Sequence, residues 1–308
     1  MTANLLVIGS INIDLLIQTS NFPKIGETVI GENMVVSPGG KGANQAVAAA
    51  RLGAKVKILG CVGNDYFADT ILGNLTSAGV NCDSVKRIEA THTGAAIVEV
   101  EAKTGNNRII LIPGANHSFS PEILNDYVKE IAQADAVLLQ FEIPPETVTQ
   151  ALKIAHNYDV EIILNAAPAI SLPEDIYPQI DTLIVNEIEC SILYGRLVED
   201  KHSLSKASLN FLNKGIKKVI VTLGEKGVFF ASKSFQRLIP AFRVQAIDTT
   251  GAGDAFVGAY AAKYFEHRSF INAVSYANLA GAFSTTKRTA QFSLPNRQDL
   301  EAFSKAVN

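Results

Sequence analysis

The sequence predicts an α/β protein with three α/β/α layers, in which a mostly parallel central sheet is covered by helices on both faces and a small β-sheet is attached as a lid. Short apolar runs recur along the chain, helical patterns separate most of them, and two segments break that alternation with β-like patterns. The 308 residues are 47% hydrophobic and 19% charged, which suits one large domain over residues 1–308 with a sizeable core.

The predicted strands of the central sheet are almost continuously apolar. The first, "NLLVIG" at residues 4–9, is typical of a parallel strand that is buried on both faces. Similar runs begin near residues 54, 134, 160, 181 and 217: "AKVKILGCVG", "ADAVLLQ", "VEIILN", "DTLIVN" and "KKVIVTLG". Strands in such an alternation are joined by right-handed helical crossovers, so the sheet is expected to be parallel.

Helical periodicity fills the intervals between these strands. Ala43, Ala46, Val47 and Ala50 follow the i, i+3, i+4, i+7 spacing of one helix face, and the segment 146–158, "ETVTQALKIAHNY", repeats this pattern. These helices are expected to pack their apolar faces on the sheet.

Two segments predict the separate β-layer. Residues 13–36 combine turn residues with short β-like pieces, and residues 91–113 contain two strand patterns around "KTGNN", which is a hairpin signal. One face of this layer would be exposed unless a substrate cleft or a partner subunit covers it. The strand pattern alone leaves both of these coverings open.

Composition excludes several classes of protein. The formal charge is −3 with no long basic run, so no nucleic-acid partner is expected. Cys61, Cys82 and Cys190 are odd in number and widely spaced, which favours a reducing, cytoplasmic location over a disulfide framework or a zinc site. The N-terminal "MTANLLVIGSINID" is interpreted as a first strand rather than a signal peptide, and no apolar stretch predicts a membrane span.

A glycine-rich segment with one acid, "AIDTTGAGDAFVGAY" at 246–260, is the main candidate for catalysis. Gly251 and Gly253 allow close approach of backbone to a ligand, and the apolar run after Asp254 predicts a buried helix that begins there. A helix N-terminus attracts phosphate, so a carboxylate in that position suits a group that accepts the proton of an attacking hydroxyl. The alternative is an aspartate that only caps the helix.

A second glycine cluster, "SPGGKGANQAVAAARLG" at 37–53, also precedes a predicted helix. Its Lys41 is followed by Gly42 rather than Ser or Thr, so it is not a Walker A loop, and Gln45 breaks the dinucleotide-binding fingerprint. Lys41, Asn44 and Gln45 bring hydrogen-bond donors together, and Asn44 suits the hydroxyl groups of a polyol. The alternative is a helix packed tightly through Gly and Ala, with Lys41 in solvent.

These motifs together resemble the ribokinase/phosphofructokinase-B family of sugar kinases over essentially the full chain, and the form "GGKGANQA" is most similar to its ribokinases. The other matching pieces occur in family order: "GSINID" at 9–14, "NEIE" at 186–189, "TLGEKG" at 222–227 and "DTTGAGDAF" at 248–256. The resemblance implies a three-layer ribokinase-like fold and ATP-dependent phosphorylation of D-ribose at its 5-hydroxyl. In ribokinases the small β-layer also pairs two subunits, so the resemblance implies a lid over the sugar and a homodimer formed through it.

The resemblance also implies roles for individual residues. Asp254 would be the general base, and the backbone N–H groups of Gly251, Ala252 and Gly253 would form an anion hole. The sugar would be held, together with Asp254, by Asn12, Asp14, Gly40, Lys41, Asn44 and Glu142. Short polar residues at strand and helix ends are also where an open α/β sheet binds its ligands.

ATP, Mg²⁺ and a monovalent cation, usually K⁺, are the ligands that the resemblance implies for the C-terminal half. Asn186 and Glu189 would position Mg²⁺ through water, although Asn186 could equally be a helix cap. The ATP site would include Asn186, Thr222, Gly224, Gly227, Gly253 and Asn278. Asp248 and Thr250 would join carbonyl groups around Ser284, Lys287, Thr289 and Ser293 to hold the monovalent cation.

The chain departs from the family pattern in the cation segment "TTKRTAQFS". Thr289 stands where relatives usually carry glycine and Phe292 where proline is common, so Thr289 is expected to strain a glycine conformation. Ala166 also replaces a frequent proline.

Other functions remain open at this point. The chain could phosphorylate deoxyribose, fructose or adenosine, or bind a sugar without catalysis. The missing dinucleotide fingerprint argues against a nicotinamide dehydrogenase.

Overall fold

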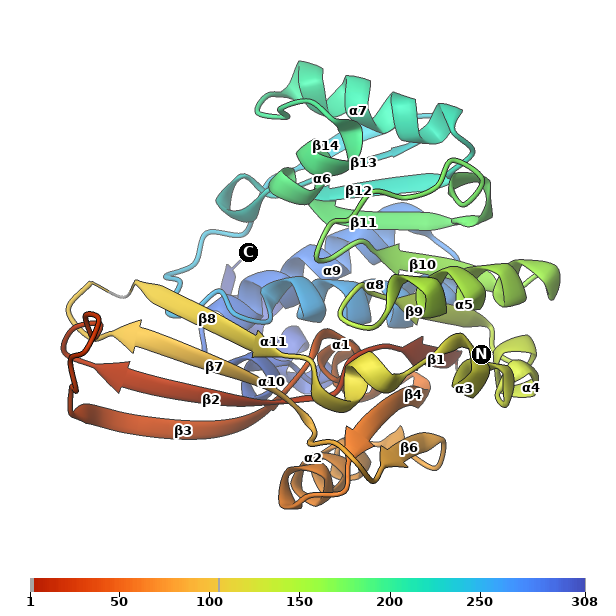
Figure 1. Ribbon diagram of the computed structural model, residues 1–308. Coiled ribbons are helices and arrows are strands. Elements are labelled where there is room, and N and C mark those ends of the chain that lie inside the picture. Colours follow the sequence, from red (N-terminus) through yellow and green to blue (C-terminus); the bar gives the residue numbers. More distant parts are fainter. Residues whose placement is uncertain (1–2, 105, 308) are drawn as a thin grey trace.

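The body of the protein is a large, mostly parallel β-sheet, described in a computed structural model that covers residues 3–104 and 106–307 (Figure 1). Its strand order is β14-β13-β12-β11-β10-β9-β1-β4-β5, with β6 also paired to β4. The strands are β1 (Asn4–Ile8), β4 (Lys55–Gly63), β5 (Val80–Asn81), β6 (Val85–Ile88), β9 (Ala136–Leu139), β10 (Glu161–Asn165), β11 (Thr182–Asn186), β12 (Lys218–Thr222), β13 (Val228–Ser232) and β14 (Gln236–Ile239). This confirms the predicted α/β class.

The strands that the sequence predicted all pair in parallel, whereas β13 and β14 are antiparallel additions at one edge. The order reverses between β1 and β9, because the chain proceeds from β1 towards β5 on one side and from β9 towards β12 on the other. Ligands of open α/β sheets bind at the carboxyl ends of strands at such a switch point.

Helices cover both faces of this sheet, because alternate strand residues point to opposite sides. In β1, Leu5 and Val7 belong to one buried cluster, and Leu6 and Ile8 belong to the other. The first cluster includes side chains of α1 (Lys41–Arg51), α2 (Tyr66–Ser77), α8 (Ala252–His267), α9 (Phe270–Thr285) and α11 (Arg297–Val307). The second includes side chains of α3 (Pro121–Asn125), α4 (Val128–Ala132), α5 (Pro145–Asn157), α6 (Glu187–Tyr194) and α7 (Lys201–Asn213). The short α10 (Ala290–Ser293) and the 3₁₀ turns η1 (Gly114–Ser118), η2 (Tyr177–Gln179) and η3 (Gly224–Lys226) complete the elements.

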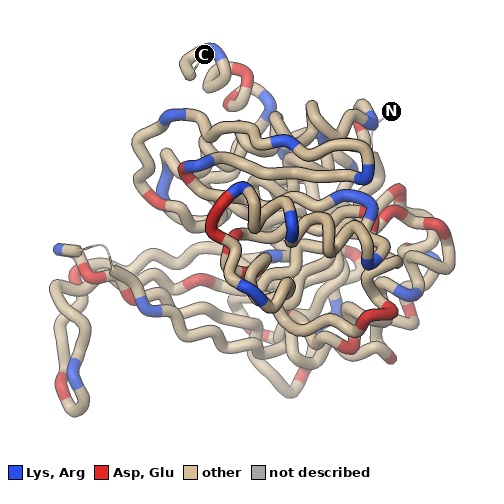
Figure 2. Tube along the Cα trace, turned by 90° about the horizontal axis from the view of Figure 1, so that it is seen from above, with Lys and Arg blue, Asp and Glu red and all other residues tan. Residues whose placement is uncertain are grey.

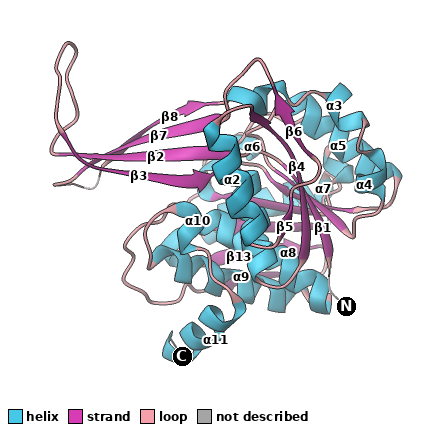
Figure 3. Cartoon of the chain, turned by 90° about the horizontal axis from the view of Figure 1, so that it is seen from below, coloured by secondary structure: helices cyan, strands magenta, loops and turns pink. Residues whose placement is uncertain are grey.

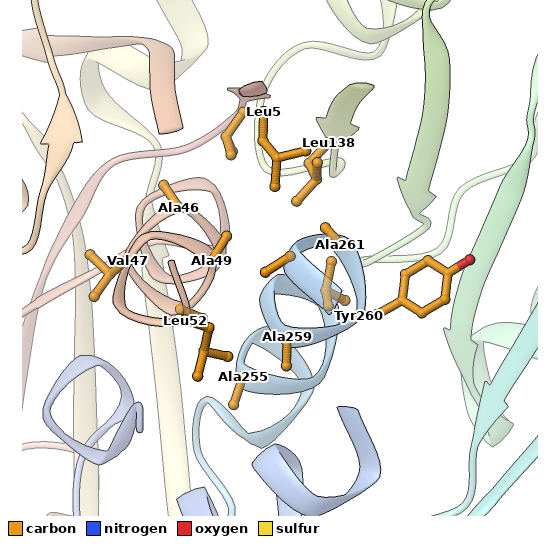
Figure 4. Packing of buried hydrophobic residues seen from close by; sticks show 14 of the residues in the cluster. Leu5, Ala46, Val47, Ala49, Leu52, Leu138, Ala255, Ala259, Tyr260 and Ala261 are labelled. Atoms are coloured by element: carbon orange, nitrogen blue, oxygen red, sulfur yellow. The ribbon is translucent and has the colours of Figure 1, made fainter. Parts of the chain in front are cut away.

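Helices α1 and α8 lie side by side and are packed through small residues (Figure 4). Ala49 and Leu52 lie on the side of α1 towards α8, and Tyr260 extends from α8 towards the sheet. A Cβ atom added at Gly258 would lie only 2.5 Å from the Ala48 Cβ and 2.7 Å from the Gln45 carbonyl oxygen. This close approach brings the short amide side chains at the start of α1 within reach of the start of α8.

A second, four-stranded sheet extends away from the body (Figures 1 and 3). Its order is β3-β2-β7-β8, with β2 (Asn12–Thr19), β3 (Gly31–Gly39), β7 (Gly94–Glu101) and β8 (Asn107–Ile112). The segments 13–36 and 91–113 supply most of these strands, although β2 begins one residue earlier and β3 continues to Gly39. Strands β7 and β8 are antiparallel, as the hairpin signal predicts, and Gly105 in "KTGNN" lies outside the described residues.

The small sheet exposes a group of large apolar side chains. They are Met34, Val36, Ile109, Ile110 and Leu111.

The charges are mixed, with Lys and Arg interspersed among Asp and Glu along the chain (Figure 2). Within residues 3–104 and 106–307, no helix is both long and apolar enough to cross a bilayer, and the three cysteines are free thiols.

Candidate active site

Asp254 lies buried in the first turn of α8, two residues inside the helix. The helix begins at Ala252, earlier than predicted, because Gly251 is the N-cap with a φ of 81° and a left-handed backbone. A side chain at Gly251 would also collide with the Ala290 backbone, whose Cα would be 2.8 Å from the added Cβ. Asp254 is therefore not a cap, and its carboxylate is free for another task.

Two side-chain amides of α1 hold the Asp254 carboxylate. Asn44 Nδ2 donates to Asp254 Oδ2 at 2.9 Å, and Gln45 Nε2 donates to Asp254 Oδ1 at 3.0 Å. Burial raises the pKa of Asp254, while the Lys41 charge and the two amides act in the opposite direction and the Glu142 charge raises it further. Donors on both oxygens orient a carboxylate that has little contact with water.

Glu142, which follows β9, ties the switch point of the sheet to the start of α1. Its Oε2 accepts hydrogen bonds from Ser10 Oγ at 2.6 Å and from the Lys41 backbone N–H at 3.1 Å. Burial alone would lower the pKa of Lys41, but the negative charges of Asp254, Glu142 and Glu189 together raise it. Lys41 therefore remains a cation beside three acids.

Asp14 is a partly buried acid on β2 whose carboxyl group has no hydrogen-bond partner among the described residues. Burial, followed by the charges of Glu142 and Asp254, raises its pKa to about 7. Gly39 on β3 makes room for it, since a Cβ there would lie 2.2 Å from an Asp14 carboxylate oxygen. A strand acid without protein donors is suited to accept hydrogen bonds from the hydroxyl groups of a ligand.

Asn12 is buried at the start of β2, where its orientation is fixed by a residue that the sequence did not single out. Asn116 Nδ2 donates to Asn12 Oδ1 at 2.6 Å, and Asn116 Oδ1 accepts from the Ile11 N–H at 2.9 Å. Gly40, the N-cap of α1 with a φ of 88°, completes the turn beside them. Asn12 thus keeps its amide donor for a ligand.

A cleft of about 940 Å³ opens beside Asp254 and Lys41, a volume suited to a nucleotide. The predicted ATP and phosphate residues that line it are Asn186, Glu189, Thr222, Gly224, Gly227, Gly251, Ala252, Gly253 and Asn278. The predicted sugar residues Asn12, Asp14, Gly40, Asn44 and Glu142 are not on its wall. Lys41 and Asp254 therefore stand between the cleft and the sugar residues.

Asn186 and Glu189 form a capping box at the start of α6. Asn186 Oδ1 accepts from the Glu189 N–H, and Glu189 Oε2 accepts from the Asn186 N–H, both at 2.8 Å. The cap interpretation of Asn186 is thus confirmed. Among the described residues the other carboxylate oxygen, Glu189 Oε1, has no hydrogen-bond partner, and Glu189 lines the cleft. Among the described residues no cluster of three or more His, Cys, Asp or Glu could hold a metal alone. One carboxylate in a phosphate site still fits Mg²⁺, which keeps its waters and binds phosphate oxygens.

The backbone N–H groups at the start of α8 are partly used within the protein. The Ala252 N–H donates to the Thr249 carbonyl at 3.2 Å. Among the described residues the Gly251 and Gly253 N–H groups have no such partner, so these two are free for an anion while Ala252 would first have to leave Thr249.

Residues 2–297 match the family model of the pfkB family of carbohydrate kinases. The chain belongs to this family. It is a carbohydrate kinase, a phosphotransferase that uses a sugar as acceptor.

The individual relatives of this pfkB kinase are also sugar kinases. It is 42% identical to a ribokinase of Haemophilus influenzae, with 98% of this chain and 99% of the relative covered, and 38% identical to a deoxyribokinase of Salmonella typhi, with 96% and 97% covered. Its fold superposes with a TM-score of 0.93 on an Arabidopsis thaliana ribokinase complexed with ribose and ATP, at 32% identity and 99% coverage of both chains.

In this kinase, Asp248 joins the two loops that were predicted to hold the monovalent cation. Its Oδ1 accepts from the Thr250 N–H and its Oδ2 from the Thr289 N–H, both at 2.9 Å. Ser284 and Ser293 are buried, with their hydroxyl oxygens 2.6 Å apart. Lys287 is exposed and its Nζ lies 4.3 Å from the Phe283 ring centroid.

Thr289 combines two unusual features. Its backbone has φ 67° and ψ 157°, a region used almost only by glycine, as the sequence predicted. Its Oγ1 is buried and has no hydrogen-bond partner among the residues that the structure describes. An orphaned hydroxyl beside the Asp248 carboxylate fits a cation ligand set made of oxygen atoms.

Replacing Thr289 with glycine is expected to stabilise the kinase by about 1 kcal/mol. Removal of the strained backbone of a β-branched residue recovers about 1–3 kcal/mol, and the greater freedom of glycine in the unfolded chain offsets part of it. Thermal unfolding checks this, with Arg288→Gly as the matched control because Arg288 has no positive φ. A lower melting temperature for Thr289→Gly than for wild type would contradict the strain.

Several buried amides near Asp254 escaped prediction or had another role assigned. Asn44 was predicted to bind the sugar, which stays a prediction, and its Nδ2 and Oδ1 bond to Asp254 and Gln291. Gln140, Asn165 and Gln291 were not singled out at all. Gln45 was noted as a donor, but its partners are distant in sequence and no local pattern shows them.

Proposed function

We propose that this kinase transfers the γ-phosphoryl group of ATP to the 5-hydroxyl of D-ribose, giving ribose 5-phosphate and ADP. The observation that carries the proposal is the buried Asp254 carboxylate at the N-terminus of α8, between the cleft and the predicted sugar residues. The ribokinase names of the relatives and the ribose and ATP bound to the Arabidopsis structure support this substrate pair.

In the proposed reaction Asp254 is the general base. The ribose hydroxyl oxygen attacks the γ-phosphorus, its proton passes to Asp254, and the bond to ADP breaks with its electrons leaving on ADP. The transition state is loose, so the proton can move late and only an ionised, well-oriented acceptor is needed. Asn44 and Gln45 favour that ionised form through their hydrogen bonds.

The remaining residues position the substrates and balance charge. Asp14 and Glu142 accept hydrogen bonds from sugar hydroxyl groups, and Asn12 donates one. Lys41 and the free N–H groups of Gly251 and Gly253 face negative charge on the phosphates. The small sheet closes over the sugar as a lid and excludes water, which limits hydrolysis of ATP.

Two ions complete the proposed site. Mg²⁺ would neutralise the phosphate charge, with Glu189 holding its waters. A monovalent cation would be held by oxygen atoms around Asp248, Thr250, Ser284, Thr289 and Ser293, while the exposed Lys287 would contribute only its backbone.

Turnover is expected to be several-fold faster in K⁺ than in a K⁺-free buffer of equal ionic strength made with a bulky organic cation. A cation beside Asp248 would fix the loops that precede α8 and α10. The initial rate of ADP release at saturating ribose and ATP measures the effect. Equal rates in the two buffers would rule out this dependence.

The kinase is expected to be a homodimer through the face of the small sheet that carries Met34, Val36 and Ile110. Light scattering at micromolar concentration should give twice the 33.0 kDa chain mass. Ile110→Lys, at a 56% exposed position on β8, should give monomers, whereas Leu209→Lys on α7 should not. A monomeric wild-type protein would contradict the dimer.

ADP release across a panel of acceptors tests the proposed substrate. Ribose should give the highest kcat/KM among ribose, deoxyribose, fructose, tagatose and adenosine. The deoxyribokinase relative, at 38% identity, lies within the 35–42% range of the ribokinase relatives, so deoxyribose is the competing candidate. A higher kcat/KM with deoxyribose would replace ribose in the proposal. The three free thiols fit the cytoplasmic location that we propose.

A further inference from the structure

The Asp254 carboxylate is connected to a chain of buried side-chain amides that leads away from the substrates. Gln45 Nε2 donates to Asp254 Oδ1 at 3.0 Å, and Gln45 Oε1 accepts from Gln140 Nε2 at 2.7 Å. Gln45 and Gln140 are both fully buried. Gln140 directly follows β9, so this chain joins the central sheet to the carboxylate through α1.

A second chain reaches the other carboxylate oxygen. Asn44 Nδ2 donates to Asp254 Oδ2 at 2.9 Å, and Asn44 Oδ1 accepts from Gln291 Nε2 at 3.3 Å. Gln291 is buried in α10, and its own Oε1 accepts from Asn74 Nδ2 on α2. Each oxygen of Asp254 is therefore held by an amide whose orientation is set by another amide.

The orientation matters because an amide side chain has a donor end and an acceptor end. If Gln45 turned over, its Oε1 would face the Asp254 carboxylate, and two acceptors in a buried site repel each other. Gln45 Nε2 also donates to Asn165 Oδ1 at 3.0 Å, and Asn165 Nδ2 donates to the Ile184 carbonyl at 3.1 Å. Gln140 then supplies the donor that the Gln45 Oε1 requires.

The contact with Gln45 leaves the other end of the Gln140 amide unpaired. Its own Oε1 is buried and has no hydrogen-bond partner among the described residues. Leaving a buried acceptor unpaired is unfavourable, so a side chain that served packing alone would be better replaced by an apolar one. The unpaired oxygen is the consequence of placing a donor, and only a donor, against Gln45.

We propose that Gln140 and Gln291 are positioning residues that fix Gln45 and Asn44 with their donor ends towards Asp254. They touch neither substrate and act through the amides that hold the carboxylate ionised and aimed at the sugar hydroxyl. This inference rests on the proposed role of Asp254 as the base.

Gln140→Glu gives a test with a pH signature. When the introduced carboxyl group is protonated, its O–H donates to Gln45 Oε1 as the Gln140 amide does, whereas the ionised group can only accept and would turn Gln45 over. The ratio of kcat for the variant to kcat for wild type should be within about threefold of one at low pH. It should fall at least tenfold as pH rises through the ionisation of the introduced carboxyl group, with little change in the KM for ribose. The charged groups around this site, Asp14, Lys41, Glu142, Glu189 and Asp254, are the same in both proteins, so the ratio reports on the introduced carboxyl group.

Two further variants separate this effect from a structural one. Gln140→Met removes the donor without adding an ionisable group, so its kcat ratio should be low at every pH. Gln150→Glu, on the surface of α5 where Gln150 bonds to Asn125, should give a ratio near one throughout. A Gln140→Glu ratio that stays flat with pH, or that equals the Gln140→Met ratio throughout, overturns the proposal.

If Gln140→Glu does not fold, Gln140→Met and Gln291→Met decide the matter. A kcat lowered about tenfold with an unchanged ribose KM supports the proposal, and a wild-type kcat overturns it. Asp254→Asn separates this result from the proposed function. Loss of turnover in Asp254→Asn together with a flat Gln140→Glu ratio refutes only the positioning role, whereas turnover retained in Asp254→Asn refutes the base itself.

Discussion

Replacing Asp254 with asparagine is expected to lower kcat about 1,000-fold while ribose binding changes by less than about tenfold. A positioned general base contributes about 10²–10⁴-fold, and the asparagine amide cannot accept the hydroxyl proton. The amide also presents a donor to Asn44 or Gln45, so one of these two hydrogen bonds is lost. The kcat from ADP release and the ribose affinity from calorimetry measure the two effects separately.

Asp126→Asn provides a matched control for this substitution. Asp126 is an exposed acid at the end of α3, so the same chemical change should leave kcat unaltered. Turnover of Asp254→Asn within tenfold of wild type would assign the proton to another acceptor. Equal losses of turnover and of ribose binding would instead indicate that Asp254 serves mainly to bind the sugar.

The sequence was sufficient for the parallel part of the fold because each buried strand is a short apolar run between turn residues. The sequence did not indicate β13 and β14. No α-helix separates β12 from β13 (Val228–Ser232), so the alternation of strand and helix that predicted the other strands ends at β12. The strands β5 and β6 also escaped, because two and four residues are too few to show a period. Antiparallel edges and short strands depend on tertiary pairing rather than on local pattern.

In the candidate site, too, residues close together in the sequence could be predicted and contacts between distant residues could not. Gly251 and Asp254 lie three residues apart, so the glycine turn and its acid could be recognised together from the sequence. Gln140 lies 95 residues from Gln45, and Gln291 lies 247 residues from Asn44, so no local spacing indicates those contacts. The small residues that allow them, such as Gly258, resemble ordinary helix packing until α1 and α8 are placed side by side.

Asp14→Asn is expected to stabilise the free kinase while weakening ribose binding. Burial and the charges of Glu142 and Asp254 raise the pKa of Asp14 from 3.8 to about 7, so the folded state holds a proton that the unfolded chain releases. Stability is therefore lost as pH rises between about 4 and 7, by up to about 4 kcal/mol. Asparagine carries no charge, so thermal unfolding should show a gain over wild type that is larger at pH 8 than at pH 5.

Ionisation of Asp14 should strengthen ribose binding, although it lowers the stability of the free protein. Sugar hydroxyl groups that donate to the ionised carboxylate favour that form, so wild-type affinity for ribose should fall as pH drops below 7. In Asp14→Asn the affinity should be at least tenfold weaker and independent of this ionisation, because a neutral amide oxygen is a weaker acceptor. An acid kept at a position where its charge destabilises the fold is explained by the ligand that the charge binds. A variant that is less stable at pH 8, or that binds ribose as wild type does, would remove that explanation.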